Sequence, residues 1–156
     1  MPFCQRCTGL YVGGLLAITL FGMFRPRPTR TVLWFHGLLL LLMVPFGYHL
    51  MPQNGEVRTL TGQLFAAGLV YLLALNPAAT VELWKRSRRR DFGAYLAGLC
   101  GCLVALQLAV RVGGSSTGAA LSWLGFAGLV LIAVLALTNV MLLPSALWRV
   151  LRRRPG

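Results

Sequence analysis

The stretch ALSWLGFAGLVLIAVLALTNVMLLPSALW, residues 120–148, contains no Asp, Glu, Lys or Arg. An α-helix needs about 20 predominantly apolar residues to cross a bilayer, so this stretch is long enough to span a membrane. The rest of the chain has the same character: 57% of the 156 residues are hydrophobic and only 12% are charged. A water-soluble core of this size cannot bury so much apolar surface. The sequence therefore predicts an integral membrane protein.

Four further stretches are long and apolar enough, or nearly so, to cross a membrane. They cover residues 8–24, 31–51, 60–80 and 92–112, and short connectors with Pro, Gly, Asn or charged residues separate them. We therefore expect an all-α fold, a single transmembrane helical domain over residues 1–156 with five spans. Pro45 should kink the second span, because proline removes a backbone donor and clashes with the preceding turn.

The basic residues divide unequally between the two ends of these spans. The chain has 15 Lys and Arg residues but only 3 Asp and Glu residues. If the spans alternate in direction, one side carries only Arg6, Arg58 and Arg111, and all the other basic residues lie on the opposite side. Basic residues concentrate on the cytoplasmic side of a membrane. We therefore expect a cell-membrane protein with its N-terminus outside and its C-terminus in the cytoplasm.

The densest basic run lies between the third and fourth spans. It comprises Lys85, Arg86, Arg88, Arg89 and Arg90. A soluble nucleic-acid-binding protein would explain this charge but not the apolar composition. Beside a membrane span, such a run favours contact with anionic lipid head groups, at about 1 kcal/mol per charge. We expect membrane lipids as partners and no nucleic acid.

Small residues recur every four positions in two of the predicted spans. They are Gly9, Gly13 and Ala17 in the first span, and Gly93, Ala97, Gly101, Ala105 and Ala109 in the fourth. Inside a bilayer, small residues let helix backbones approach closely. We expect both stripes to pack against neighbouring helices.

Two cysteines, Cys4 and Cys7, stand three residues apart immediately before the first span. On a helical turn, side chains at this spacing share a face. Arg6 and the positive end of the helix dipole would both favour the thiolate form. A cysteine pair of this kind on the outer side has three alternatives: a structural disulfide, a catalytic dithiol or half of a metal site.

A second polar cluster joins the second and third spans. It holds His49, Asn54, Glu56, Arg58 and Thr61, and the alternating topology places it at the same membrane face as the cysteine pair. One interpretation is a site shared by the two clusters. The other is a solvated turn, because Asn-Gly is a common turn pair and Glu56 could simply pair with Arg58.

The second histidine and the two remaining cysteines are assigned structural positions. His36 lies about 20 Å from His49 along a helix, so it cannot join the outer cluster. We expect it at the cytoplasmic interface of the membrane. Cys100 and Cys102 lie too deep in the fourth span to form a disulfide with the outer pair, and we expect both to be small packing residues.

The residues Pro2-Phe3-Cys4-Gln5-Arg6-Cys7-Thr8-Gly9, followed later by Asn54, Arg58 and Thr59-Leu60-Thr61-Gly62, resemble the DUF2085 family of predicted multi-pass membrane proteins. The resemblance covers about the first 62 residues. It implies a membrane location and an additional Cys-His pair upstream of the cysteine motif. This sequence begins at the motif, so its N-terminus is short relative to the family: either the true start lies upstream or this is a shortened member.

Three functions fit these observations, and we rank them in the following order. The first is a metal-binding or structural site in which Cys4, Cys7 and His49 would hold zinc or iron. The second is a membrane scaffold or accessory subunit whose small-residue stripes bind partner membrane helices. The third is an enzyme, a membrane thiol oxidoreductase that uses a quinone, with Cys4 or Cys7 attacking and Arg6 stabilising the thiolate. Against the third function, this sequence lacks the second outward cysteine pair that such enzymes generally use.

Overall fold

The computed structural model describes residues 4–24, 26, 28–48, 50, 52, 54–75 and 90–152. All the regular secondary structure in these residues is helical. The helices are α1 (Gln5–Phe24), α2 (Arg30–Leu41), α3 (Met43–Gly47), α4 (Gly55–Ala74), α6 (Arg90–Val112) and α7 (Ser115–Arg152).

Among the described residues, five segments are long and apolar enough to cross a membrane. They are Gln5–Phe24, Arg30–Gly47, Gly55–Ala74, Phe92–Val112 and Ser116–Leu142. The predicted all-helical membrane architecture with five candidate spans is therefore confirmed. All five spanning helices begin before the predicted starts of the spans, by one to five residues. Cys7 therefore lies inside α1, and α4 begins at Gly55 because the Asn54 side chain accepts a hydrogen bond from the Val57 N–H at 2.9 Å. Residues 76–80 of the predicted third span lie outside the described residues.

The second span is interrupted, as its proline predicts. Helix α2 ends at Leu41 and α3 begins at Met43. Pro45 has no N–H to bond to the Leu41 carbonyl, and its ring crowds that carbonyl. The interruption therefore lies one turn before the proline.

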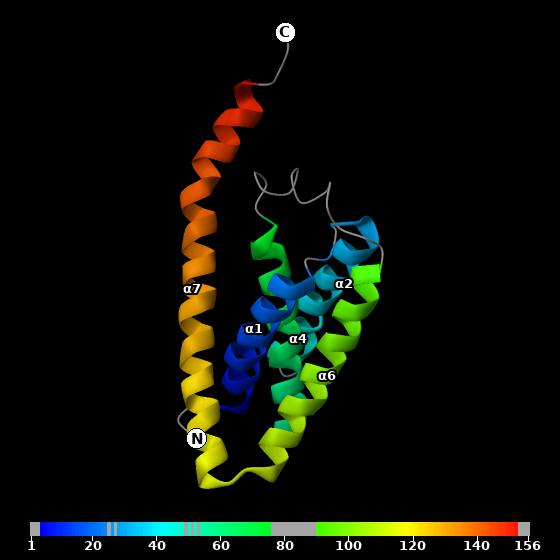
Figure 1. The fold of residues 1–156 in the computed structure, drawn as a ribbon, viewed down its shortest axis with the longest axis vertical. Coiled ribbons are helices and arrows are strands. Elements are labelled where there is room, and N and C mark those ends of the chain that lie inside the picture. The colour runs from blue at the N-terminus through cyan, green and yellow to red at the C-terminus, as the bar shows by residue number, and fades with distance from the viewer. Residues whose placement is uncertain are drawn as a thin grey trace.

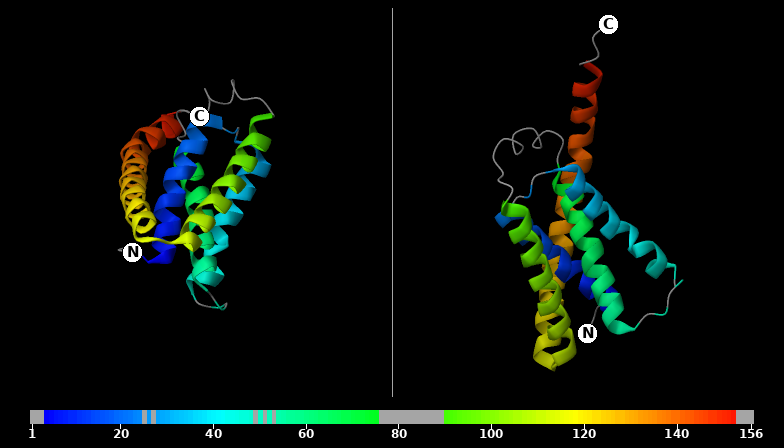
Figure 2. Two further views of the ribbon diagram at one scale, coloured as in Figure 1. Left: turned by 60° about the horizontal axis from the view of Figure 1, so that its bottom comes forward. Right: turned by 90° about the vertical axis from the view of Figure 1, so that its right-hand side faces the viewer.

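Successive spans run in opposite directions (Figures 1 and 2). The start of α1, the start of α4, the end of α6 and the start of α7 lie at one end of the bundle, which we call the cysteine end. The start of α2, the start of α6 and the last turns of α7 lie towards the opposite end. Helix α7 is the longest at 38 residues, and Figure 1 shows it continuing beyond the other helices at the opposite end.

Helix α4 contacts all the other described helices, and α1 contacts α4, α6 and α7. The approach of α1 to α4 is very close: a Cβ added to Gly9 would overlap the Thr59 carbonyl oxygen. A Cβ on Gly62 would lie 2.5 Å from the Arg6 carbonyl oxygen, and one on Gly13 would meet the Gln63 side chain. The small residues of the first span therefore do pack against a neighbouring helix, as expected.

The small-residue stripe of α6 behaves differently. Gly93 and Gly101 are exposed, and a Cβ added to either would meet no atom within 4 Å. At these two positions the stripe therefore packs against no helix of the described residues, and the expected packing within the chain is wrong there. Contact with a partner helix stays a prediction.

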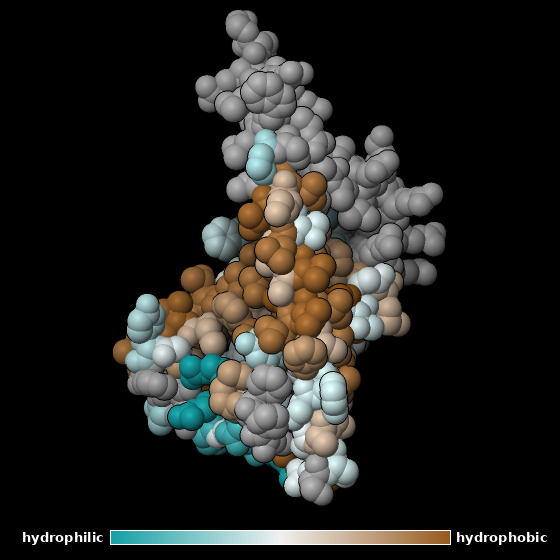
Figure 3. Space-filling model, turned by 90° about the vertical axis from the view of Figure 1, so that its left-hand side faces the viewer, coloured by the Kyte–Doolittle hydropathy of each residue, from teal (hydrophilic) through white to brown (hydrophobic). Residues whose placement is uncertain are grey.

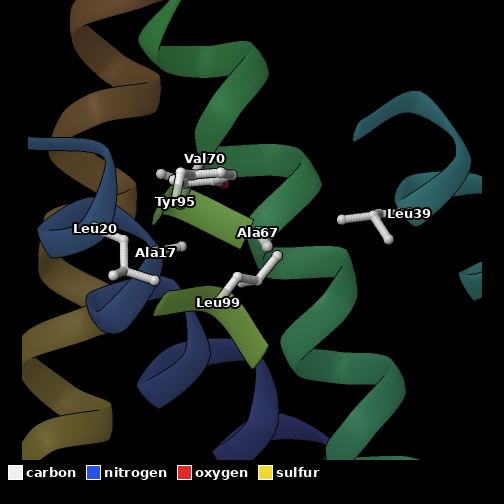
Figure 4. Close-up of a cluster of buried hydrophobic side chains, with 7 residues drawn as sticks. All are labelled: Ala17, Leu20, Leu39, Ala67, Val70, Tyr95 and Leu99. Atoms are coloured by element: carbon white, nitrogen blue, oxygen red, sulfur yellow. The ribbon is translucent and has the colours of Figure 1, made fainter. Parts of the chain in front are cut away.

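The main hydrophobic core joins four helices (Figure 4). Its buried side chains are Ala17 and Leu20 of α1, Leu39 of α2, Ala67 and Val70 of α4, and Tyr95 and Leu99 of α6. Around this core the outer surface is apolar. Figure 3 shows hydrophobic residues over the middle of the face formed by α7, and more polar residues towards the cysteine end. Large side chains such as Trp123, at 76% exposure, and Met141, at 76%, belong to this surface, which a bilayer would solvate.

Candidate functional site

The cysteine pair forms a compact thiol site at the start of α1. Cys4 precedes the first residue of the helix and is exposed, and Cys7 lies on the first turn. Both are free thiols with their Sγ atoms 2.6 Å apart. A disulfide bond is about 2.05 Å long. Two thiolates on one tetrahedral zinc ion, each about 2.3 Å from the metal, would be about 3.8 Å apart. The separation is therefore closer to that of a disulfide than to that of a metal-bound pair.

The surroundings of Cys4 favour its thiolate. The Cys4 and Cys7 sulfurs lie within hydrogen-bond distance of each other, and this contact is the largest cause that lowers the pKa of Cys4 below its ordinary value. The Cys7 backbone N–H donates to the same sulfur at 3.2 Å, and the backbone N–H and the positive charge of Arg6 act in the same direction. Cys4 therefore occupies the N-cap position of α1, where a negative charge is stabilised. An exposed cysteine of this kind is the more nucleophilic member of its pair.

The rest of the protein holds this first turn in place. The Thr59 hydroxyl of α4 donates to the Gln5 carbonyl at 3.3 Å. Arg6 Nη2 donates to the carbonyl of Phe46, in α3, at 3.0 Å. The cysteine segment is therefore attached to both the start of α4 and the end of α3. The segment therefore contacts the helix that carries the second polar cluster, through Thr59, which directly follows Arg58.

Most of that second cluster has a structural role. Asn54 caps α4, and the Thr61 hydroxyl donates to the Val57 carbonyl of its own helix at 2.8 Å. Glu56 forms a bidentate ion pair with Arg111 of α6, at 2.7 and 2.8 Å, rather than with Arg58. Both partners are about half exposed, at 47% and 60%, so water and salt screen the pair and it contributes little to stability. Nothing local in the sequence links residues 56 and 111, which is why the pair was missed.

The third predicted metal ligand, His49, lies outside the described residues. In the part of the chain that the structure describes, no three His, Cys, Asp or Glu side chains are grouped closely enough to hold a metal ion. The basic run is placed only at its end: residues 85–89 lie outside the described residues, and Arg90 begins α6.

His36 is buried inside the bundle, so its expected position at the membrane interface is wrong. It is 0% exposed and stacks on Tyr71 of α4 with ring centroids 3.9 Å apart. Its Nδ1–H donates to the Val32 carbonyl at 2.8 Å, and Nε2 accepts from the Tyr95 hydroxyl of α6 at 2.9 Å. The signal was present in the sequence, because residues 32, 36 and 39 share one helical face, and all three are buried.

The two deep cysteines differ in their packing. Cys102 is partly buried against the main core, as expected of a packing residue. Cys100 is exposed on α6, so the same expectation is wrong for it.

The fold defines a multi-pass helical membrane protein with a thiol pair at one end. Residues 1–72 match the DUF2085 family, described as a predicted membrane protein, and this confirms the family resemblance. The matched part runs from the cysteine pair through α1, α2 and α3 into α4, and it contains Gly9 and Gly62 of the close α1–α4 crossing. No curated protein and no solved structure matched the chain.

Proposed function

We propose that this membrane protein carries out thiol–disulfide exchange through Cys4 and Cys7. The observation that supports this most is the arrangement of the two free sulfurs, which lie 2.6 Å apart on one helical turn with Cys4 exposed at the helix N-terminus. Cys4 is the attacking thiolate, because the groups around it lower its pKa. Cys7 is the resolving thiol that completes the intramolecular disulfide.

The site faces the outside of the cell membrane in this proposal. At the cysteine end lie Arg6, Arg58 and Arg111, whereas the other twelve basic residues fall on the opposite side of the alternating spans. This asymmetry supports a cytoplasmic opposite end, whose basic residues contact anionic lipid head groups. The outside is also the compartment in which disulfides persist.

A metal ion held by Cys4, Cys7 and His49 is a second candidate. Its support is the contact between Arg6 and the Phe46 carbonyl, which attaches the cysteine segment to a residue three positions before His49. Zinc or iron would accept such a mixed sulfur and nitrogen ligand set. The sulfurs would have to separate by about 1 Å to reach tetrahedral positions. Exchange requires the opposite movement, and we therefore place it first.

Equilibration with glutathione redox buffers tests the choice between thiol–disulfide exchange and metal binding. The protein carries Cys100→Ala and Cys102→Ala, so that only the outer pair can react. It is purified in mild detergent and equilibrated with the buffers, and the reaction is then quenched with acid and the free thiols are alkylated. Mass spectrometry should show the loss of both alkylation sites together as the buffer becomes oxidising, without added glutathione mass, because the second thiol resolves the mixed disulfide. The Cys7→Ser variant should instead accumulate glutathione on Cys4.

The metal content of the same samples separates the alternatives. Stoichiometric zinc or iron that disappears in the Cys4→Ser variant would contradict exchange and support the metal site. If neither metal nor a cooperative disulfide is found, the proposal fails and a scaffold without a site of its own is left.

The pH dependence of alkylation tests the role of Cys4. Because its pKa is lowered, Cys4 should remain thiolate at pH values where an ordinary thiol is protonated. As the pH falls, the rate of Cys4 alkylation should therefore decrease at a lower pH than the rate for an ordinary thiol. Rates are measured with a membrane-impermeant maleimide on intact cells that express the Cys100→Ala, Cys102→Ala chain, with and without Cys7→Ala. The Cys7→Ala change should raise the midpoint of the profile, since it removes the side-chain hydrogen bond that is the largest cause of the lowered pKa of Cys4. Labelling only after the cells are opened would contradict the proposed outer location.

A further inference from the structure

The cysteine end carries an excess of positive charge. Its described charged residues are three arginines, Arg6, Arg58 and Arg111, against one carboxylate, Glu56. Of the other two acidic residues of the chain, Asp91 lies at the start of α6, at the opposite end, and Glu82 lies outside the described residues. The carboxylate is also engaged by Arg111 through both of its oxygens. The balance of charge around the thiol site is therefore positive, whichever further contacts the arginines make.

Arg6 acts on the reacting sulfur, and Arg58 is exposed at the same end of the bundle. Arg6 lies between the two cysteines in the chain, and its positive charge already acts on Cys4. Arg58 is exposed on the first turn of α4 and directly precedes Thr59, whose hydroxyl bonds to the Gln5 carbonyl beside Cys4. A reagent that approaches the exposed Cys4 sulfur therefore enters the field of these groups.

We propose that the thiol site takes small anionic disulfides, of the class in which each half carries a carboxylate, in preference to neutral ones. This inference rests on the exchange function proposed above and specifies its substrate. A surface with a positive balance of charge raises the local concentration of an anion and the rate of its encounter. It also stabilises the negative charge that passes from the attacking sulfur to the departing one.

The exchange consists of two displacements that balance. The Cys4 thiolate attacks one sulfur of the substrate, a bond forms between Cys4 Sγ and that sulfur, and the other half leaves as a thiolate with the electron pair of the broken bond. Cys7 loses its proton to water, and its thiolate attacks Cys4 Sγ and expels the second half. The protein dithiol is oxidised to a disulfide, and the substrate disulfide is reduced by two electrons to two thiolates.

The experiment compares two disulfides that differ only in charge. The reagents are the dianionic bis(nitrobenzoate) disulfide and its uncharged bis-amide, each reacted with the full chain carrying Cys100→Ala and Cys102→Ala in uncharged detergent. The rate with the dianionic disulfide is divided by the rate with the uncharged one. This ratio is then divided by the same ratio measured for a small uncharged thiol, which corrects for the different intrinsic reactivity of the two disulfides. We expect a normalised ratio of about 10 at low salt, which falls towards 1 as the Debye length shortens to about 3 Å in about 1 M salt.

Two matched arginine variants locate the effect. Arg58→Gln should lower the normalised ratio about threefold, because it removes one positive charge from the cysteine end. Arg30→Gln removes an exposed arginine from the start of α2, at the opposite end, and should leave the ratio unchanged. The variants differ by the same atoms, so a general effect of losing an arginine would appear in both.

The outcomes distinguish this inference from the function on which it rests. Reaction that requires Cys4 but proceeds with a normalised ratio near 1 at low salt would overturn the anionic preference and leave exchange standing. A ratio that Arg58→Gln and Arg30→Gln lower equally would also overturn it. No Cys4-dependent reaction with either reagent would overturn both proposals.

Discussion

Replacing Gly9 with alanine is expected to lower the free energy of unfolding by about 1–3 kcal/mol, the usual cost of overpacking. The added Cβ would overlap the Thr59 carbonyl oxygen, which belongs to the backbone of α4 and cannot rotate away. The two helices would have to separate, and the hydrogen bond from Thr59 to the Gln5 carbonyl would lengthen with them. Gly62→Ala, which meets the Arg6 carbonyl oxygen from the other helix, should behave in the same way.

A matched substitution on α6 serves as the control. Gly101 is also a helical glycine, but a Cβ there meets no atom within 4 Å. Gly101→Ala should therefore be neutral or stabilising by up to about 1 kcal/mol, because alanine is the better helix former. Unfolding is followed by circular dichroism during titration of dodecyl sulfate into mild-detergent micelles. Equal stability of Gly9→Ala and Gly101→Ala would show that the α1–α4 crossing is not as close as described.

The second large effect is expected from Tyr95→Phe, which removes a single buried hydroxyl. That hydroxyl donates to Nε2 of the fully buried His36, so the variant leaves an imidazole nitrogen without its donor inside the bundle. Hydrogen bonds between membrane helices average about 0.6 kcal/mol and reach about 1.7 kcal/mol. The unpaired nitrogen adds to this loss, and we expect a total of about 1–2 kcal/mol.

The control for Tyr95→Phe is Tyr48→Phe, which removes the same atom from a side chain that is 77% exposed. It should change the free energy of unfolding by less than about 0.5 kcal/mol. A double-mutant cycle with His36→Leu measures the coupling directly, since Tyr95→Phe should cost less once the imidazole is absent. Additive effects of the two substitutions would contradict the hydrogen bond.

The sequence was sufficient to predict five spans and their approximate positions, but neither the exact helix starts nor the contacts between the helices. Length and hydropathy locate each span because a bilayer has a fixed thickness. Pro45 also located the interruption in the second span, because its effect is confined to the preceding turn. Alternating direction brought the cysteine pair and residues 54–58 to the same end of the bundle, and the bond between Thr59 and Gln5 shows that they meet.

Contacts between helices depend on rotation about each helix axis, which hydropathy does not determine in a chain that is apolar on nearly every face. This explains why His36 was assigned to the interface although it faces α4 and α6. It also explains why two similar small-residue stripes differ, since Gly9 faces α4 and Gly101 faces outward. Glu56 and Arg111 are 55 positions apart, and only the packing of α4 against α6 brings them together.

The close crossing of α1 and α4 also has a consequence for the order in which the protein is assembled. It joins the first and third spans, so every residue of that crossing has been synthesised once α4 is complete. The crossing can therefore form before α7 has been synthesised. The contact between α7 and α1, where Gly128 lies against the Tyr11 carbonyl, is equally close but can form only after the last span is made. An alanine at Gly9 would thus act on a contact between two spans that exist before α7 does.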